Sequence, residues 1–167
     1  GSGTAALTVD GSGNLISQAN ATLTYKRPIV NVTGSTVSPT AAQSGSIFTL
    51  NLAGGITVTL PAAAAGLTYE FHVGTTFTGT FQIDAASSAD TLQGLITMGP
   101  SLTGTATNAG ATTMIAGPAA ADHQYIASAD TKGRMLGTRL KYTAITDAIW
   151  LVEGTAVTSG SCATPFS

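Results

Sequence analysis

The chain contains two histidines, and each has a carboxylate close by in the sequence. His72 is two positions after Glu70, so on a strand their side chains would share one face, and His123 follows Asp122 directly. A protein metal centre needs three or four ligands that converge on one point. These pairs do not supply that number, and the sequence favours surface or interface histidines over a metal site.

The segment 10–14 reads DGSGN and has oxygen-bearing side chains at its first, third and fifth positions. That spacing matches the start of a calcium-binding loop, which also needs a glycine in sixth place and an acidic residue in twelfth. Leu15 and Ala21 occupy those two places. The segment is therefore predicted to be a tight turn between two short strands rather than a calcium site.

Catalytic chemistry has few candidates in this chain. Asp84 and Asp90 are six positions apart and could flank a glycosidic bond, but nothing in the sequence places them in a cleft. Cys162, the single cysteine, lies in a polar stretch where no base is fixed beside it. Nucleophile-elbow and phosphate-loop motifs do not occur. We expect a non-enzymatic protein with no catalytic, cofactor-binding or metal site; a carbohydrate-active enzyme is the enzymatic alternative.

The composition points to assembly. Charged residues make up 8% of the chain, against about 25% in an average soluble domain. Threonine (29 residues), alanine (27) and glycine (20) take their place. A hydrophobic content of 43% excludes general disorder. A surface with so few charges is poorly suited to a protein that stays monomeric at high concentration.

Several classes of partner are disfavoured. The net charge is −2, and the six basic residues do not form the continuous stripe that nucleic acid requires. They are Lys26, Arg27, Lys132, Arg134, Arg139 and Lys141. No stretch approaches the roughly 18 consecutive apolar residues of a membrane helix. We therefore expect neither a nucleic-acid partner nor a membrane partner.

Alternation of apolar and polar residues with a period of two recurs along the chain and indicates strands. No segment shows the three-to-four-residue repeat of an amphipathic helix. We predict an all-β fold: a single β-sandwich or jelly-roll-like domain of about ten short antiparallel strands with an extended N-terminal arm. The expected division is an arm with a short β-hairpin (1–33), the sandwich domain (34–153) and a polar C-terminal tail (154–167).

The segment 55–73, GITVTLPAAAAGLTYEFHV, has four consecutive alanines between two strand-like stretches. One helical turn is too short to be stable by itself, and the period of two resumes at Leu67. The alanines are predicted to be a compact connector at the bend of a hairpin. The strands at 47–52 and 56–60 are likewise expected to pair with each other.

The same region resembles a recurring segment of tailed-bacteriophage virion proteins. The resemblance includes GITVTLPAAAAGLTYEF at 55–71, the pair ID at 83–84 with DTLQG at 90–94, and AIWLVEG at 148–154. It therefore covers about 100 residues. LTVDGSGNL at 7–15 is similar to turns in phage fibre and head proteins.

This resemblance implies a virion surface component and brings no catalytic residues with it. The leading hypothesis is a capsid decoration (cement) protein, located on the outer surface of the phage head and bound to the major capsid protein. A homo-oligomer is expected, and a trimer would match the local symmetry of a capsid. The alternative is a head-fibre, tail-fibre or receptor-binding module that recognises host surface polysaccharide through loops such as 99–121. The chain shows no long repetitive shaft, which favours decoration.

Overall fold

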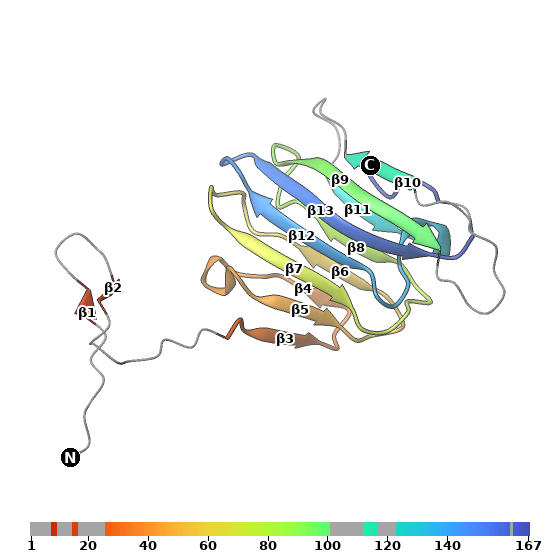
Figure 1. Ribbon diagram of the computed structural model, residues 1–167, viewed down its shortest axis with the longest axis horizontal. Helices are drawn as coiled ribbons and strands as arrows, with labels where there is room; N and C mark the ends of the chain where they lie inside the picture. Colours follow the sequence, from red (N-terminus) through yellow and green to blue (C-terminus); the bar gives the residue numbers. More distant parts are fainter. Residues whose placement is uncertain (1–7, 10–14, 17–25, 101–111, 117–122, 161) are drawn as a thin grey trace, which may run out of the picture.

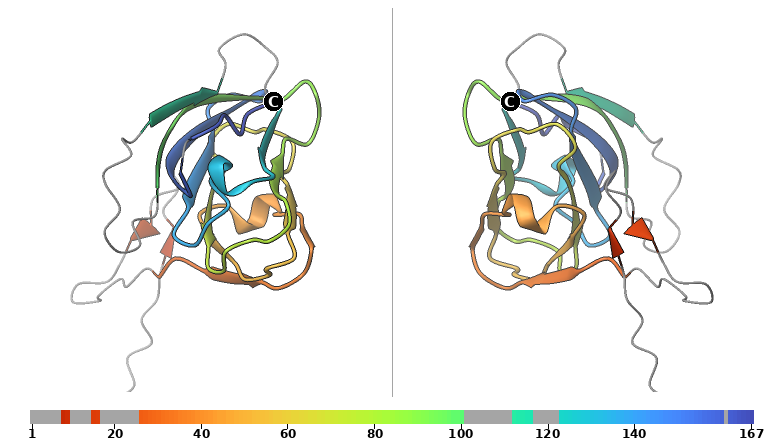
Figure 2. Two further views of the ribbon diagram at one scale, coloured as in Figure 1. Left: turned by 90° about the vertical axis from the view of Figure 1, so that its right-hand side faces the viewer. Right: turned by 90° about the vertical axis from the view of Figure 1, so that its left-hand side faces the viewer.

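Two β-sheets face each other around one hydrophobic core (Figure 1, Figure 2). The computed structural model describes residues 8–9, 15–16, 26–100, 112–116, 123–160 and 162–167. Within these ranges the helical elements are two single 3-10 turns, η1 (Ala41–Gln43) and η2 (Asp130–Lys132). The predicted all-β class is confirmed. None of the described helices is long and apolar enough to cross a membrane.

The larger sheet has seven strands and the smaller sheet has four. The order in the seven-stranded sheet is β10 (Thr112–Ala116), β9 (Thr91–Pro100), β13 (Ile149–Thr158), β12 (Arg139–Ala144), β7 (Thr68–Val73), β5 (Ile47–Leu50) and β3 (Ile29–Val32). The order in the four-stranded sheet is β11 (Gln124–Ala127), β8 (Phe81–Asp84), β6 (Ile56–Thr59) and β4 (Thr36–Val37). The predicted hairpin of the arm is present as the antiparallel pair β1 (Thr8–Val9) and β2 (Leu15–Ile16).

From β3 to β8 the chain passes back and forth between the sheets, one strand at a time. Strands β3, β5 and β7 therefore pair in parallel in one sheet, and β4, β6 and β8 pair in parallel in the other. The strand in the opposite sheet serves as the crossover that parallel pairing requires. β9 and β13 are also parallel, whereas β12 is antiparallel to both β7 and β13.

The expectation of purely antiparallel strands is thus wrong, and so are both expected hairpins. β5 and β6 lie in different sheets, as do β6 and β7. The period of two reports only which side chains face the core, and this alternation is the same in parallel and antiparallel strands. The alternation therefore could not show which strands pair with each other in the folded protein.

The alanine segment 62–65 is the connection between β6 and β7, and it is not helical. Two distant carboxylates hold it. The Ala63 N–H donates to Asp90 Oδ2 at 3.3 Å, and the Ala65 N–H donates to Asp147 Oδ1 at 3.1 Å. Ala63 itself is buried. The prediction of a compact connector is confirmed, but the connector joins two sheets instead of two paired strands.

Aromatic side chains fill the space between the sheets. On the seven-stranded sheet, Phe71 packs against Phe48 at a ring-centroid distance of 5.4 Å and against Tyr142 at 5.8 Å. On the four-stranded side, Phe81 packs against Phe77 at 5.1 Å and against Tyr125 at 5.5 Å. Each such side chain stabilises the fold by roughly 1.5–3 kcal/mol through burial, so this aromatic layer fixes how the sheets face each other.

Both ends of the β-domain differ from the expected boundaries. β3 is part of the seven-stranded sheet, although residues 29–32 were assigned to the arm. β13 continues to Thr158, so the expected start of the polar tail at residue 154 falls inside a strand. Phe166 is only 8% exposed and forms a bridge with Tyr125. Because most residues after 153 are small or polar, their sequence gives little sign of this packing.

Gly94, which pairs with Val152, provides a test of the close contact between β9 and β13. Its φ is +125°, and an added Cβ would collide with the Val152 carbonyl oxygen. Gly94→Ala should lower the free energy of unfolding by about 2 to 4 kcal/mol, because backbone strain and a steric clash add. The matched control is Gly54→Ala, where an added Cβ meets no atom within 4 Å. Equal denaturant midpoints for the two variants would contradict this description.

Candidate functional site

Charged side chains gather on the outer face of the seven-stranded sheet. On β7, Phe71 and Val73 face the core, so Glu70 and His72 face outward. On β12 and β13 the same alternation turns three further charged side chains outward. We name this group the charged face; it consists of Arg27, Glu70, His72, Arg139, Lys141 and Glu153.

Strand register brings these residues together from distant parts of the sequence. Glu70 is paired with Lys141 across β7 and β12, and Lys141 is paired with Glu153 across β12 and β13. Arg139 is paired with His72 on the same face. Since like positions on neighbouring strands lie within side-chain reach, the register brings together all members of the charged face except Arg27.

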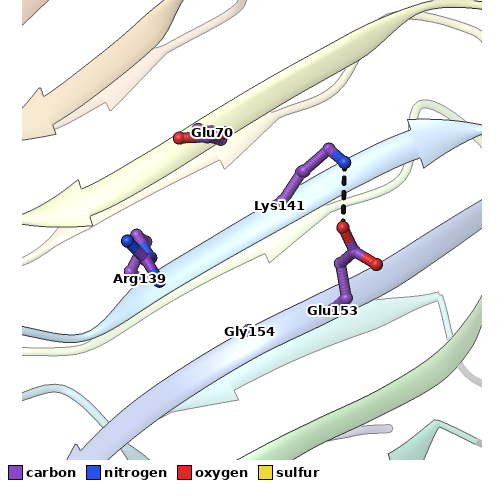
Figure 3. A pocket seen from close by; sticks show the side chains of 5 residues that line it. All are labelled: Glu70, Arg139, Lys141, Glu153 and Gly154. Atoms are coloured by element: carbon purple, nitrogen blue, oxygen red, sulfur yellow. Dashed lines mark hydrogen bonds and ion pairs between the residues drawn. The ribbon is translucent and has the colours of Figure 1, made fainter.

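Ion pairs connect most of the charged face. Lys141 Nζ lies 2.9 Å from Glu153 Oε1, and Figure 3 marks this ion pair with a dashed line. Arg27, from the segment before β3, donates from Nη1 to Glu70 Oε1 at 2.7 Å and from Nε to the Gly45 carbonyl at 2.9 Å. The other Glu70 oxygen lies 3.2 Å from His72 Nε2. The predicted proximity of Glu70 and His72 on one strand face is confirmed.

Arg139 differs from its neighbours. Its side chain is exposed and makes no ion pair or hydrogen bond with any residue in the described part of the chain. It lies between two surface hollows and lines both of them. The first, of about 370 Å³, is otherwise lined by Glu70, Lys141, Glu153 and Gly154 (Figure 3). The second, of about 300 Å³, is otherwise lined by His72, Val73, Leu136, Gly137, Thr138 and Thr155.

Aliphatic side chains flank the charges. One row across the sheet runs from Ile29 on β3 through Ile47, Glu70, Lys141 and Glu153 to Leu95 on β9. Ile29 is 70% exposed and Leu95 is 53% exposed, and Leu136 beside the second hollow is 57% exposed. Exposed aliphatic side chains therefore lie at both ends of this row, on the same side of the sheet as the charged residues.

The outer face of the four-stranded sheet is different. Its outward positions are threonine, glutamine, isoleucine and a single aspartate: Thr36, Thr57, Thr59, Gln82, Asp84, Gln124 and Ile126. Asp84 Oδ1 accepts a hydrogen bond from Gln82 Nε2 at 2.6 Å. The two sheets therefore present one charged surface and one nearly uncharged surface.

The carboxylates considered for glycoside hydrolysis have different surroundings. Asp90 is 6% exposed, and its Oδ2 is bonded to the Ala63 N–H of the connector. Asp84 is part of the outer face of the four-stranded sheet. Neither residue lines one of the two hollows described above. Asp90 is thus placed to hold the connector, not to reach a substrate.

The remaining candidate residues do not form a metal site in the part of the chain that the structure describes. No group of three or more His, Cys, Asp or Glu residues is close enough there to hold an ion. His123 Nδ1 lies 3.0 Å from the Asp90 carbonyl oxygen, and the Cys162 Sγ lies 3.6 Å from Thr158 Oγ1. Asp122 and the DGSGN segment 10–14 are outside the described residues.

The charged face was not predicted from the sequence. Lys132, Arg134, Arg139 and Lys141 lie within ten positions of one another, and the sequence gives no sign that their roles differ. In the structure Arg134 instead joins two loops, because it donates to Asp130 Oδ1 at 2.7 Å and to the Thr78 and Gly79 carbonyls. The alternation of Arg139 and Lys141 with buried Leu140 was the available signal, but the acidic partners could be identified only from the strand pairing.

Comparison with protein-family models, with curated proteins and with solved structures finds no match for this chain. The functional interpretation therefore rests on the fold and on the charged face.

The pH dependence of stability tests the role of Glu70. Partial burial would raise the pKa of Glu70, but the hydrogen bonds and charges of Arg27 and His72 outweigh burial and hold this pKa below its ordinary value of 4.5. A carboxyl with a lowered pKa contributes stability above its unfolded pKa and loses it as the pH falls through the folded pKa. Glu70→Gln should cost about 1 kcal/mol at neutral pH, and this cost should shrink as the pH falls below 4.5.

Denaturant unfolding of the wild type and of Glu70→Gln across the acid pH range measures the difference in their free energies of unfolding. Glu153→Gln is the matched control, because the Glu153 side chain is 53% exposed and its pair with Lys141 is exposed as well. An exposed pair contributes about 0–1 kcal/mol. A Glu70→Gln cost that stays constant down to the acid transition would contradict the assignment.

Substitutions of Asp90 and of Asp84 should have different effects on the free energy of unfolding. Asp90→Ala leaves the buried Ala63 N–H without its acceptor and should lower the free energy of unfolding by about 1–3 kcal/mol. Asp84→Ala removes a partly exposed contact and should change this free energy by about 0.5 kcal/mol or less. The carbohydrate-active alternative predicts instead that Asp84→Asn or Asp90→Asn abolishes a hydrolytic activity.

Proposed function

We propose that this chain is a non-enzymatic virion structural protein, specifically a capsid decoration (cement) protein on the outer surface of a phage head. The observation that carries the proposal is the charged face. In a chain with 8% charged residues, charges and exposed aliphatic groups meet on one side of a β-body. A face that combines charged and exposed aliphatic side chains suits a protein that binds a large, repeated surface.

The β-body is suited to this role. A decoration protein has to stay folded while it spans junctions between capsomers. Here the two facing sheets enclose one hydrophobic core, and residues near the end of the described chain are fixed to it. The His123 and Gln124 N–H groups donate to the Ser167 carbonyl oxygen at 2.9 and 3.0 Å, which extends the pairing beyond β11.

The expected partner is the major capsid protein, and the expected state is a homo-oligomer, with a trimer favoured. Repeated weak contacts gain strength when several copies bind together, and a threefold assembly would match the local threefold axes of a capsid. The resemblance at 55–71, 83–84, 90–94 and 148–154 supports the same assignment.

One observation favours decoration over a fibre or receptor-binding module. Proteins that bind polysaccharide commonly place aromatic rings on their surface as stacking platforms. All nine aromatic side chains in the described part of the chain are buried: Phe48, Tyr69, Phe71, Phe77, Phe81, Tyr125, Tyr142, Trp150 and Phe166. Most of the loop region 99–121 expected to recognise sugar lies outside the described residues.

The proposal predicts stoichiometric binding to expanded phage heads that lack the native protein. Bound protein should raise the resistance of the heads to heat and to chelators, because it bridges neighbouring capsomers. Sedimentation of the heads with labelled protein measures the binding, and light scattering during heating measures the resistance. Adsorption to host cells without any binding to heads would reject decoration in favour of the receptor-binding alternative.

A further inference from the structure

We propose that Arg139 is the anchor residue of the charged face and that it binds a carboxylate of a partner protein. The identity of that partner as the capsid shell rests on the proposed function. The chemistry of the contact, a guanidinium with a protein carboxylate, rests on the charged face itself.

The charge pattern singles out Arg139. The two other permanent cations of the charged face already have carboxylate partners, because Arg27 pairs with Glu70 and Lys141 pairs with Glu153. The face carries three permanent cations and two carboxylates, so Arg139 supplies its excess positive charge. An anionic group on the partner would complement this surface. A guanidinium offers a planar pair of donors that matches a carboxylate at two points.

The sheet holds Arg139 in position before any partner arrives. β12 lies between β7 and β13 and is paired with both along its length. The adjacent Leu140 is fully buried on the other face. The backbone of Arg139 is therefore ordered before binding, which lowers the entropic cost of association.

The two hollows beside Arg139 indicate which other partner side chains would lie next to the carboxylate. The first hollow is lined by charged groups, whereas the second contains Leu136, which is 57% exposed, and Val73. A partner would place its acidic side chain at Arg139 and an aliphatic side chain against Leu136. This combination describes a polypeptide surface. Nucleic acid would instead require several unpaired cations along one line.

A titration with poly-L-glutamate tests the carboxylate chemistry without any phage component. At low ionic strength, amide chemical shifts of the isotope-labelled full chain should change mainly on β7 and β12 around Arg139. Arg139→Ala should weaken the interaction about tenfold, as expected for an anchor residue, while Arg139→Lys should retain part of it. The control is Lys132→Ala on η2, outside the charged face, which should bind as the wild type does.

Three outcomes of this titration would overturn the inference. In the first, the wild type does not bind poly-L-glutamate. In the second, Arg139→Ala and Lys132→Ala weaken the binding equally. In the third, inorganic phosphate at matched charge changes the amide chemical shifts as strongly as poly-L-glutamate does. The last would indicate a general anion site. Unchanged thermal unfolding of the variants shows that the fold is intact.

Expanded heads then separate this inference from the proposed function. Arg139→Glu should bind heads at least about tenfold more weakly than Lys132→Glu. Equal binding of both variants would reject Arg139 as the anchor and leave the decoration role standing. Failure of the wild type to bind heads, with Arg139-dependent binding of poly-L-glutamate, would reject the decoration role and leave the carboxylate contact standing.

Discussion

The structure depends on how the strand backbones satisfy their hydrogen bonds. From β3 to β8, each strand pairs with the strand two places along the chain, because the intervening strand lies in the opposite sheet. Backbone groups buried without partners are costly, so this pairing fixes the path of the connections from β3 to β8. The aromatic core follows from it, since parallel neighbours such as Phe48 and Phe71 lie directly beside each other.

The same ladders produce the charged face. Glu70, Lys141 and Glu153 become neighbours because β7, β12 and β13 are adjacent in the sheet. In a chain with few charges, other charged residues have structural tasks: Asp90 holds the alanine connector and Arg134 joins loops. Arg139 has no such task within the described structure. Arg139 is therefore proposed to contact a partner, whereas Asp90 and Arg134 hold parts of the fold together.

A weakly charged surface also bears on assembly. Threonine-rich positions on the four-stranded sheet can approach another surface closely without a large cost for removing water from charges. The charged face can instead provide orientation, because misplaced charge pairs are unfavourable. Both properties would serve the proposed decoration role, which requires close packing over a wide area and a defined register on a repeated lattice.

The sequence by itself determined the local structure. Its period of two indicated strands within 47–52 and 56–60, its lack of helical periodicity indicated the all-β class, and its spacing placed Glu70 and His72 on one face. Pairing was decided only in the tertiary structure. Alternation records whether a side chain faces inward, and it is identical for parallel and antiparallel neighbours. The parallel stack, the burial of Phe166 and the meeting of Glu70 with Lys141 and Glu153 depend on contacts between distant residues, which no local pattern encodes.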